Sequence, residues 1–389
     1  MALALAVNAC GGSSDRTARR DAELQSVLEH LRTEQGTAWG VVVPGFGAAV
    51  EPAGAAGGAP GRAVSGAVAP PAARELRPED RFHVGSVTKT FTAALIMQLD
   101  QEGVLSIGDP IADWIDFPGG DGVTIEMLLG HTSGIPDFTQ FAYSRDSTPE
   151  QSIALVAGQP FVFAPGTAWA YSNTNYTMLG LIAEKATSTP WAELVASRFF
   201  GPLGLRDTYV WSGTAEGPTA SGSRLVCGAP SEPSCAPPRT GFGIVAVDDG
   251  FDWAVAWSAG AIVSTAADLA KWMVALVAGD VVDAAHRRLM TTPSQQSVAS
   301  NFGEQVAALA RTSGGGTLRW TGDGLGLFEY TIEGLGTAWG HEGSINGFVA
   351  NAAYVESTRQ GIAVTSNFDE SDSFSALGAV AVAVGGRPG

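Results

Sequence analysis

Ser86 and Lys89 are the residues of this 389-residue sequence best suited to covalent chemistry. A serine hydroxyl is a weak nucleophile unless a base lies beside it, and a lysine amine can be that base. The apolar spacing that follows predicts a helix over residues 86–102, and residues three apart share a helical face. Unpaired N–H groups at a helix start favour an oxyanion and lower the pKa of a nearby ammonium. The pattern therefore indicates a nucleophile and its base.

Two further motifs supply groups that could assist this pair. Tyr171-Ser172-Asn173 precedes a predicted helix and is the only Tyr-x-Asn of the chain. His341-Glu342-Gly343 lies in a predicted strand near the C-terminus. His83-Val84-Gly85 also fits His-x-Gly, but it leads directly into Ser86 and cannot form a separate wall of a cleft. A phenol, an amide and an imidazole are thus available to the hydroxyl and the amine.

The set Ser-x-x-Lys, Tyr-x-Asn and His-x-Gly, in this order, resembles the serine β-lactamase and DD-peptidase superfamily. The chain looks most like the class C β-lactamase and DD-carboxypeptidase branch. The residues around the motifs also resemble those of the family, in segments 82–89, 128–136, 165–166 and 340–344. The resemblance covers about residues 21–385, nearly the whole chain.

The resemblance implies a covalent acyl-enzyme mechanism with a role for each motif residue. Ser86 is expected to be the nucleophile, and Lys89 and Tyr171 to share the general base and acid work. Asn173 is expected to orient Lys89 and to hydrogen-bond the substrate, and His341 to support the Tyr171 hydroxyl from across the cleft. The mechanism requires no cofactor and no metal.

The same resemblance implies the residues that bind the substrate. The backbone N–H groups of Ser86 and Ser344 are expected to form the oxyanion hole, a contribution usually worth several kcal/mol. Gly343 and Trp257 are expected to contact the substrate, with a buried core position as an equal alternative for Trp257. His131 is interpreted as a structural hydrogen-bonding residue.

Glu342 is the main departure from the family pattern. DD-carboxypeptidases and β-lactamases bind a substrate carboxylate near the third motif, commonly with Thr or Ser at its middle position. Here that position is Glu342, and residues 328–337 contain no Arg or Lys. If its side chain faces the cleft, two like charges at ~4 Å cost up to about 4 kcal/mol at a surface-like dielectric. A free substrate amine would instead suit Glu342.

The expected function is therefore a serine hydrolase that cleaves an ester or amide, with peptides bearing D-residues as one option. The first alternative is a D-alanyl-D-alanine carboxypeptidase or class C-like β-lactamase. The second is a non-catalytic penicillin-binding sensor that acylates slowly and does not turn over.

Composition limits the partners. The formal net charge of −17 argues against nucleic acid, because phosphate binding needs clustered Lys and Arg. It argues equally against adsorption to anionic lipid. Asp248, Asp249 and Asp252 are interpreted as a solvated acidic loop and not as a metal site. A small-molecule or peptide acyl substrate is the expected partner.

The N-terminus and the cysteines predict export. Residues 1–10 resemble a truncated lipoprotein signal that ends at Cys10, the expected lipidation site, and 11–20 form a polar tether. Cys227 and Cys235 bracket a turn-rich loop that a disulfide could close in an oxidising compartment. The protein is expected in the cell envelope as a lipoprotein or outside the cell, with the membrane reached only through Cys10.

The remaining elements predict an α+β fold. Helical spacing is present in residues 21–35, 124–130, 149–157, 174–187, 191–200, 265–279 and 373–384. Strands are predicted at 39–46, 257–264, 325–332, 337–342, 348–355 and 362–366. Their close spacing implies antiparallel pairing. We expect one serine hydrolase domain over residues 21–389, with an antiparallel sheet lobe (21–103 and 251–389) and an inserted helical lobe (104–250). The site would lie between the lobes.

Overall fold

The computed structural model describes residues 39–44, 63–65, 79–142, 146–227, 242–247, 253–306, 318–368 and 371–385, together with Ser26 and Ser144. The predicted signal, tether and first helix fall outside these residues, apart from Ser26. So do Cys10, Cys235, the side chain of Cys227 and the acidic loop at 248–252. Lipidation and the disulfide therefore stay predictions.

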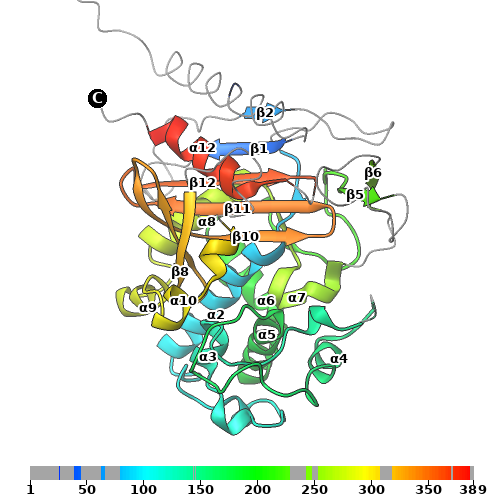
Figure 1. Ribbon diagram of the computed structural model, residues 1–389, viewed down its shortest axis with the longest axis vertical. Coiled ribbons are helices and arrows are strands. Elements are labelled where there is room, and N and C mark those ends of the chain that lie inside the picture. Colours follow the sequence, from blue (N-terminus) through cyan, green and yellow to red (C-terminus); the bar gives the residue numbers. More distant parts are fainter. Residues whose placement is uncertain are drawn as a thin grey trace, which may run out of the picture.

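A seven-stranded antiparallel sheet forms the upper part of the molecule in Figure 1. Its order is β2 (Ala63–Ser65), β1 (Trp39–Pro44), β12 (Gln360–Ser366), β11 (Phe348–Val355), β10 (Gly336–Ile345), β9 (Phe328–Ile332) and β8 (Leu318–Asp323). β1 pairs with β12, so segments from both ends of the chain build one sheet. The predicted antiparallel sheet flanked by helices is confirmed.

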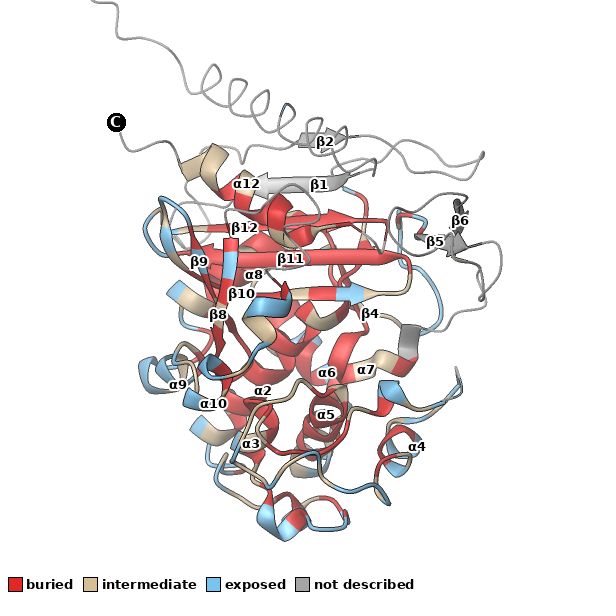
Figure 2. Ribbon diagram, in the orientation of Figure 1, coloured by how far each residue is buried: buried red, intermediate tan, exposed pale blue. Residues whose placement is uncertain are grey.

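Helices cover both faces of this sheet (Figure 1). Successive strand residues point to opposite faces. In β11, Ala352 packs in the cluster that includes Leu269 of α8 (Ala266–Ala278), and Ala353 in the cluster that includes Leu377 of α12 (Ser373–Gly385). Because both faces are covered, all of β11 is buried, as Figure 2 shows in red.

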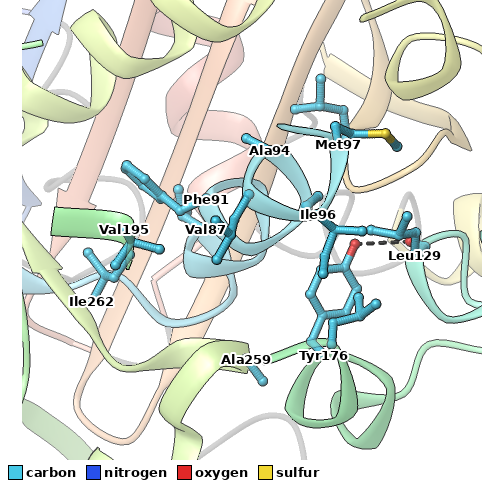
Figure 3. Close-up of a cluster of buried hydrophobic side chains, with 14 of the residues drawn as sticks. Val87, Phe91, Ala94, Ile96, Met97, Leu129, Tyr176, Val195, Ala259 and Ile262 are labelled. Atoms are coloured by element: carbon cyan, nitrogen blue, oxygen red, sulfur yellow. Dashed lines mark hydrogen bonds between the residues drawn. The ribbon is translucent and has the colours of Figure 1, made fainter. Parts of the chain in front are cut away.

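α2 (Thr88–Gln101) is the central helix, and eleven of its fourteen residues are buried. Figure 3 shows its apolar side chains packed beside Leu129, Tyr176 and Val195 from three other helical segments. Phe91 also stacks on Trp272 of α8, with ring centroids 4.0 Å apart. α2 is thereby held between the helical region and the sheet, which fixes the position of the residues at its start.

The helical region lies below the sheet in Figure 1. It contains α3 (Ile125–Leu129), α4 (Pro149–Ala154), α5 (Asn173–Thr187), α6 (Trp191–Val195) and α7 (Trp257–Gly260). The other described elements, apart from short 3-10 and π turns, are β3 (Phe82–His83), β4 (Tyr209–Val210), β5 (Ser223–Cys227), β6 (Phe242–Ala246), β7 (Ile262–Ser264), α9 (Ala284–Met290) and α10 (Gln295–Val298).

Two predicted elements differ in detail from the structure. The predicted strand over 257–264 is a short helix, α7, followed by the strand β7. The helix predicted from residue 86 begins as a 3-10 turn, Gly85–Val87, before α2. β3 pairs with β7, and this pairing fixes the position of the chain just before the 3-10 turn. Within the described residues, no helix is both long and apolar enough to cross a bilayer.

Candidate active site

Ser86 and Lys89 lie one turn apart where the 3-10 turn passes into α2. Lys89 Nζ donates to Ser86 Oγ at 2.9 Å, to Asn173 Oδ1 at 2.7 Å and to the Ala259 carbonyl at 2.8 Å. An ammonium has three donors, so all three are used. The structure thus brings together the hydroxyl, the amine and the amide that the sequence singled out.

The Lys89 side chain is completely buried. Burial disfavours an ammonium and lowers the pKa of Lys89 from its ordinary value to about 7, although the charges of Asp137 and Glu342 oppose this shift. Near neutral pH a substantial fraction of Lys89 is therefore a free amine. A free amine hydrogen-bonded to a serine hydroxyl can accept its proton.

Tyr171 stands beside the pair, just before α5. Lys89 Nζ lies 4.9 Å from the centroid of its ring. Burial raises the pKa of Tyr171 well above its ordinary value, although the neighbouring Ser86 hydroxyl acts in the opposite direction. The phenol is therefore neutral at physiological pH, and it can donate a proton to an oxygen or nitrogen near Ser86.

Asn173 is oriented by Asp137, which the sequence reasoning missed. Asn173 Nδ2 donates to Asp137 Oδ2 at 2.9 Å, which leaves Oδ1 to accept from Lys89. The two segments are tied further where Thr174 Oγ1 donates to the Pro136 carbonyl at 2.7 Å. Asp137 directly follows the segment 128–136 that carries part of the resemblance. A carboxylate at this position was the feature of the sequence that could have identified Asp137 as a residue of the site.

His341 lies on β10, buried, with its ring stacked on Phe328 at a centroid distance of 4.0 Å. Burial lowers the pKa of His341 to about 3, so the imidazole is neutral. Its Nδ1 lies at the Glu342 carbonyl and must carry the hydrogen, because the carbonyl only accepts. The rings of His341 and Tyr171 are 6.2 Å apart, and the structure, which describes both residues, shows no hydrogen bond between them.

The β10 backbone passes directly against the turn that carries Ser86. A Cβ on Gly343 would lie 2.7 Å from the Ser86 backbone N, and a Cβ on Gly85 would lie 3.0 Å from the Ser344 backbone N. Gly85 also has φ +51°, in the left-handed region that favours glycine. Two glycines therefore let the two segments meet, and the N–H groups expected to form the oxyanion hole belong to facing backbones.

Glu342 is half-buried on β10 and interacts electrostatically with the groups at Ser86. Burial raises the pKa of Glu342 to about 7, while the Lys89 ammonium lowers it. In turn the carboxyl raises the pKa values of Lys89 and Tyr171. The neighbouring Gly343 is the residue of β10 that faces Ser86, and successive strand residues point to opposite faces, so Glu342 acts on these groups through its charge.

His131 and Trp257 occupy supporting positions. His131 Nδ1 accepts from the Ser172 N–H at 3.2 Å, and its ring lies 4.4 Å from that of Tyr171, in agreement with a structural role. Trp257 is half-buried, its ring is 5.9 Å from that of Trp191, and a Cβ on Gly180 would lie 2.9 Å from it. These contacts correspond to the core alternative for Trp257. No group of metal-ligating side chains occurs among the described residues.

A sheet with a helical region, and a serine–lysine pair at the start of the central helix, define the serine β-lactamase and DD-peptidase class. The chain belongs to the Beta-lactamase family of serine hydrolases, because the model of this family matches residues 45–386. The predicted family and fold are confirmed.

Individual relatives differ in name. Penicillin-binding protein 4* of Bacillus subtilis (strain 168) is 34% identical over 146 residues, 36% of this chain and 32% of that protein. Esterase EstB of Burkholderia gladioli is 32% identical over 157 residues, 35% of this chain and 40% of that protein. The matched segments thus span about a third of these curated relatives. A D-stereospecific amidohydrolase from Streptomyces sp. is similar in structure, with a TM-score of 0.71 and 25% identity over 90% of this chain and 95% of that chain.

Proposed function

We propose that this protein cleaves ester or amide bonds through an acyl-enzyme on Ser86. The observation that carries the proposal is the 2.9 Å hydrogen bond from Lys89 to Ser86 Oγ, made by an amine whose pKa is lowered to about 7. The relatives named as a penicillin-binding protein, an esterase and a D-stereospecific amidohydrolase support acyl chemistry at such a serine.

The reaction proceeds in two halves. Lys89, as the free amine, takes the Ser86 proton while Oγ attacks the substrate carbonyl carbon, and the backbone N–H groups of Ser86 and Ser344 stabilise the oxyanion. When the intermediate collapses, the leaving group receives a proton from Tyr171, and Lys89 returns one to the phenol. Water then repeats the sequence on the acyl-enzyme, releases the acid and restores the Ser86 hydroxyl.

Lys89 is the principal base in this proposal. The low pKa of its buried ammonium makes the free amine abundant near pH 7, whereas burial keeps Tyr171 protonated. Tyr171 therefore acts as the proton donor. Asn173 positions Lys89 through the hydrogen bond at 2.7 Å, and the neutral His341 shapes the wall beyond Tyr171.

The charge of the cleft favours substrates without a carboxylate near the scissile bond. Asp137 and Glu342 stand against the single ammonium of Lys89, and Lys89 is itself partly neutral at pH 7. A penicillin or a D-Ala-D-Ala terminus carries the carboxylate that this arrangement repels. Esters and amides, including those of D-residues, are the proposed substrates.

A substrate panel tests the function. Purified protein should hydrolyse p-nitrophenyl esters, and Ser86→Ala should lower kcat/KM by at least about a thousandfold, because the nucleophile is lost. Ser197→Ala changes an exposed serine and is the matched control. Efficient hydrolysis of benzylpenicillin or D-Ala-D-Ala, with p-nitrophenyl esters untouched, would favour the carboxypeptidase or β-lactamase alternative. A long-lived penicillin adduct without turnover would favour the sensor.

Export is a separate part of the proposal. The apolar residues before Cys10 and the spacing of Cys227 and Cys235 support a lipid-modified or secreted protein with one disulfide. Intact mass of the protein from its native cells, before and after reduction, tests both modifications. A mass without a lipid, together with alkylation of Cys227 and Cys235 before any reduction, would contradict them.

A further inference from the structure

Three contacts join His131 to the segment that carries Tyr171. The Ala170 N–H donates to the His131 backbone carbonyl at 3.0 Å, and the Ser172 N–H donates to His131 Nδ1 at 3.2 Å. Between these two hydrogen bonds, the ring of Tyr171 lies 4.4 Å from the His131 ring, with an angle of 33° between the two planes. One residue therefore contacts the chain just before Tyr171, the chain just after it, and the aromatic ring itself.

The segment at Tyr171 lies outside the helices and strands of the described structure. Tyr171 and Ser172 come just before α5, and the backbone of Ser172 is extended, with φ −146° and ψ 121°. Backbone N–H groups outside a helix or strand need other partners. On both sides of Tyr171 that partner is His131, so the position of the phenol depends on this residue.

His131 makes these contacts from a backbone conformation that favours glycine. It follows the C-terminal end of α3 with φ 55°, in the left-handed region. Residues other than glycine are uncommon there, and they persist where surrounding contacts hold them, often at functional sites. A glycine would end α3 without this strain. The contacts of the His131 side chain, and not the end of the helix, therefore explain a histidine at this position.

The His131 ring is neutral and its Nδ1 is a hydrogen-bond acceptor. A backbone N–H only donates, so Nδ1 must accept from Ser172, and the hydrogen of the neutral ring is then on Nε2. Burial, followed by the charges of Lys89 and His341, lowers the pKa of His131 well below its ordinary value. The Nδ1 lone pair therefore stays available to Ser172 across the working range of the enzyme.

We infer that His131 is a positioning residue that holds the Tyr171 phenol where it protonates the leaving group at Ser86. This inference rests on the proposed function. As the bond to an alkoxide leaving group breaks, the phenol proton passes to the departing oxygen, and the Lys89 ammonium, which took the Ser86 proton, restores the phenol. A p-nitrophenolate ion is a weak base and departs without that proton.

The test compares two esters that share an acyl group and differ only in the leaving group. Because kcat/KM reports the steps up to acylation, its ratio for ethyl butyrate over p-nitrophenyl butyrate measures the assistance given to the leaving group. General acid catalysis contributes about 10²- to 10⁴-fold, so a misplaced phenol in His131→Gly should lower this ratio at least about tenfold. Damage that affects both esters equally cancels in the ratio.

Two further variants separate the acceptor from the rest of the side chain. Asparagine tolerates the left-handed conformation and has an oxygen that can accept from the Ser172 N–H, so His131→Asn should stay closer to the wild-type ratio than His131→Gly does. His131→Leu fills the space without an acceptor and should behave like His131→Gly. It keeps the comparison available if the glycine variant does not fold.

Ser188→Gly is the matched control, because Ser188 has the same φ of 55° at the end of α5 and is exposed. It should keep the wild-type ratio. Tyr171→Phe is the reference for a lost proton donor. Adding His131→Gly to Tyr171→Phe should lower the ratio no further, because His131 acts through the phenol.

The outcomes separate this inference from the proposed function. An unchanged ratio in His131→Gly and His131→Leu, or a further fall in the double variant, overturns the inference and leaves Ser86 chemistry intact. The same holds if the ratio in His131→Asn falls as far as in His131→Gly. Failure of the wild-type protein to hydrolyse either ester overturns the proposed function and the inference together.

Discussion

At the scale of single residues, two carboxylates determine how readily Lys89 loses its proton. Burial lowers its pKa to about 7, and the charges of Asp137 and Glu342 keep it from falling further. Asp137 also accepts a hydrogen bond from the Asn173 amide. One carboxylate therefore both orients the amide that binds Lys89 and affects the pKa of Lys89.

Asp137→Asn should move the acid limb of the pH–rate profile to lower pH. Removing an anion beside an ammonium lowers the pKa of Lys89, so the free amine, and with it the rate, persists to lower pH. We expect a shift of about half a pH unit or more for hydrolysis of an uncharged p-nitrophenyl ester. The half-maximal pH of kcat/KM gives the readout, and a purely structural role for Asp137 would not move it.

Asp116→Asn removes an exposed carboxylate and serves as the control for this measurement. Its acid limb should coincide with that of the wild type. An unchanged or upward-shifted limb in Asp137→Asn would mean that Lys89 is not the group that titrates during catalysis.

At the scale of elements, the site depends on how closely β10 approaches the turn at Ser86. A Cβ on Gly343 would lie 2.0 Å from the Val84 carbonyl oxygen, closer than any real contact. The two backbones that supply the expected oxyanion donors can therefore meet only if this residue is glycine.

Gly343→Ala should separate β10 from the turn and misplace the oxyanion donors. A displacement of about 1 Å at a catalytic group can cost about 100-fold in rate, so kcat/KM for an ester should fall by this order. Gly158→Ala is the matched control, because a Cβ there meets nothing within 4 Å. Retention of full activity in Gly343→Ala would show that the strand does not contribute to transition-state binding.

The long periodic elements of the fold were predictable from the sequence. β11 has the predicted bounds, and α5 and α12 deviate by one residue at most, because their apolar spacing is sustained. β8 was not predicted, since it follows a glycine run at 314–316 that is typical of a loop. The strand predicted at 257–264 was partly wrong, because a short apolar run is compatible with both a helix and a strand.

At the scale of the whole molecule, burial makes the ionised form of Asp323 unfavourable in the folded state. This residue ends β8, is 1% exposed, and its carboxylate accepts a hydrogen bond from Trp169 Nε1 at 3.0 Å. Burial raises the pKa of Asp323 well above its ordinary value. The folded state therefore binds this proton more tightly than the unfolded state, and stability is lost as the pH rises through the folded pKa.

Asp323→Asn should raise the Tm at pH 8. The amide keeps an oxygen for Trp169 and cannot ionise, so it mimics the protonated acid that the fold favours. The gain should shrink on acidification and vanish below about pH 3, where the wild-type carboxyl is protonated in both the folded and the unfolded state. Thermal unfolding across this pH range is the measurement, with Asp116→Asn as the control; lower stability of Asp323→Asn at pH 8 would contradict the account.

The sequence was sufficient to predict that the motif residues meet in one site. It was not sufficient to predict the charge interactions among the residues of that site. Ser86, Lys89 and Asn173 were identified because their types and spacing are unusual in this chain. The role of Asp137 and the direction of Glu342 depend on tertiary contacts, which no local pattern encodes. The support that His341 was expected to give the Tyr171 hydroxyl likewise depends on a ring placement that the sequence cannot specify.

The central claim is that Ser86 carries the acyl group, and peptide mapping after an acid quench tests it most directly. Trypsin cleavage after Arg81 and Lys89 releases residues 82–89, which contain one serine. After brief mixing with a p-nitrophenyl ester, fragmentation of this peptide should locate the acyl mass on Ser86, and Ser86→Ala should show none. Continued hydrolysis by Ser86→Ala, or an acyl group on any other residue, would contradict the account.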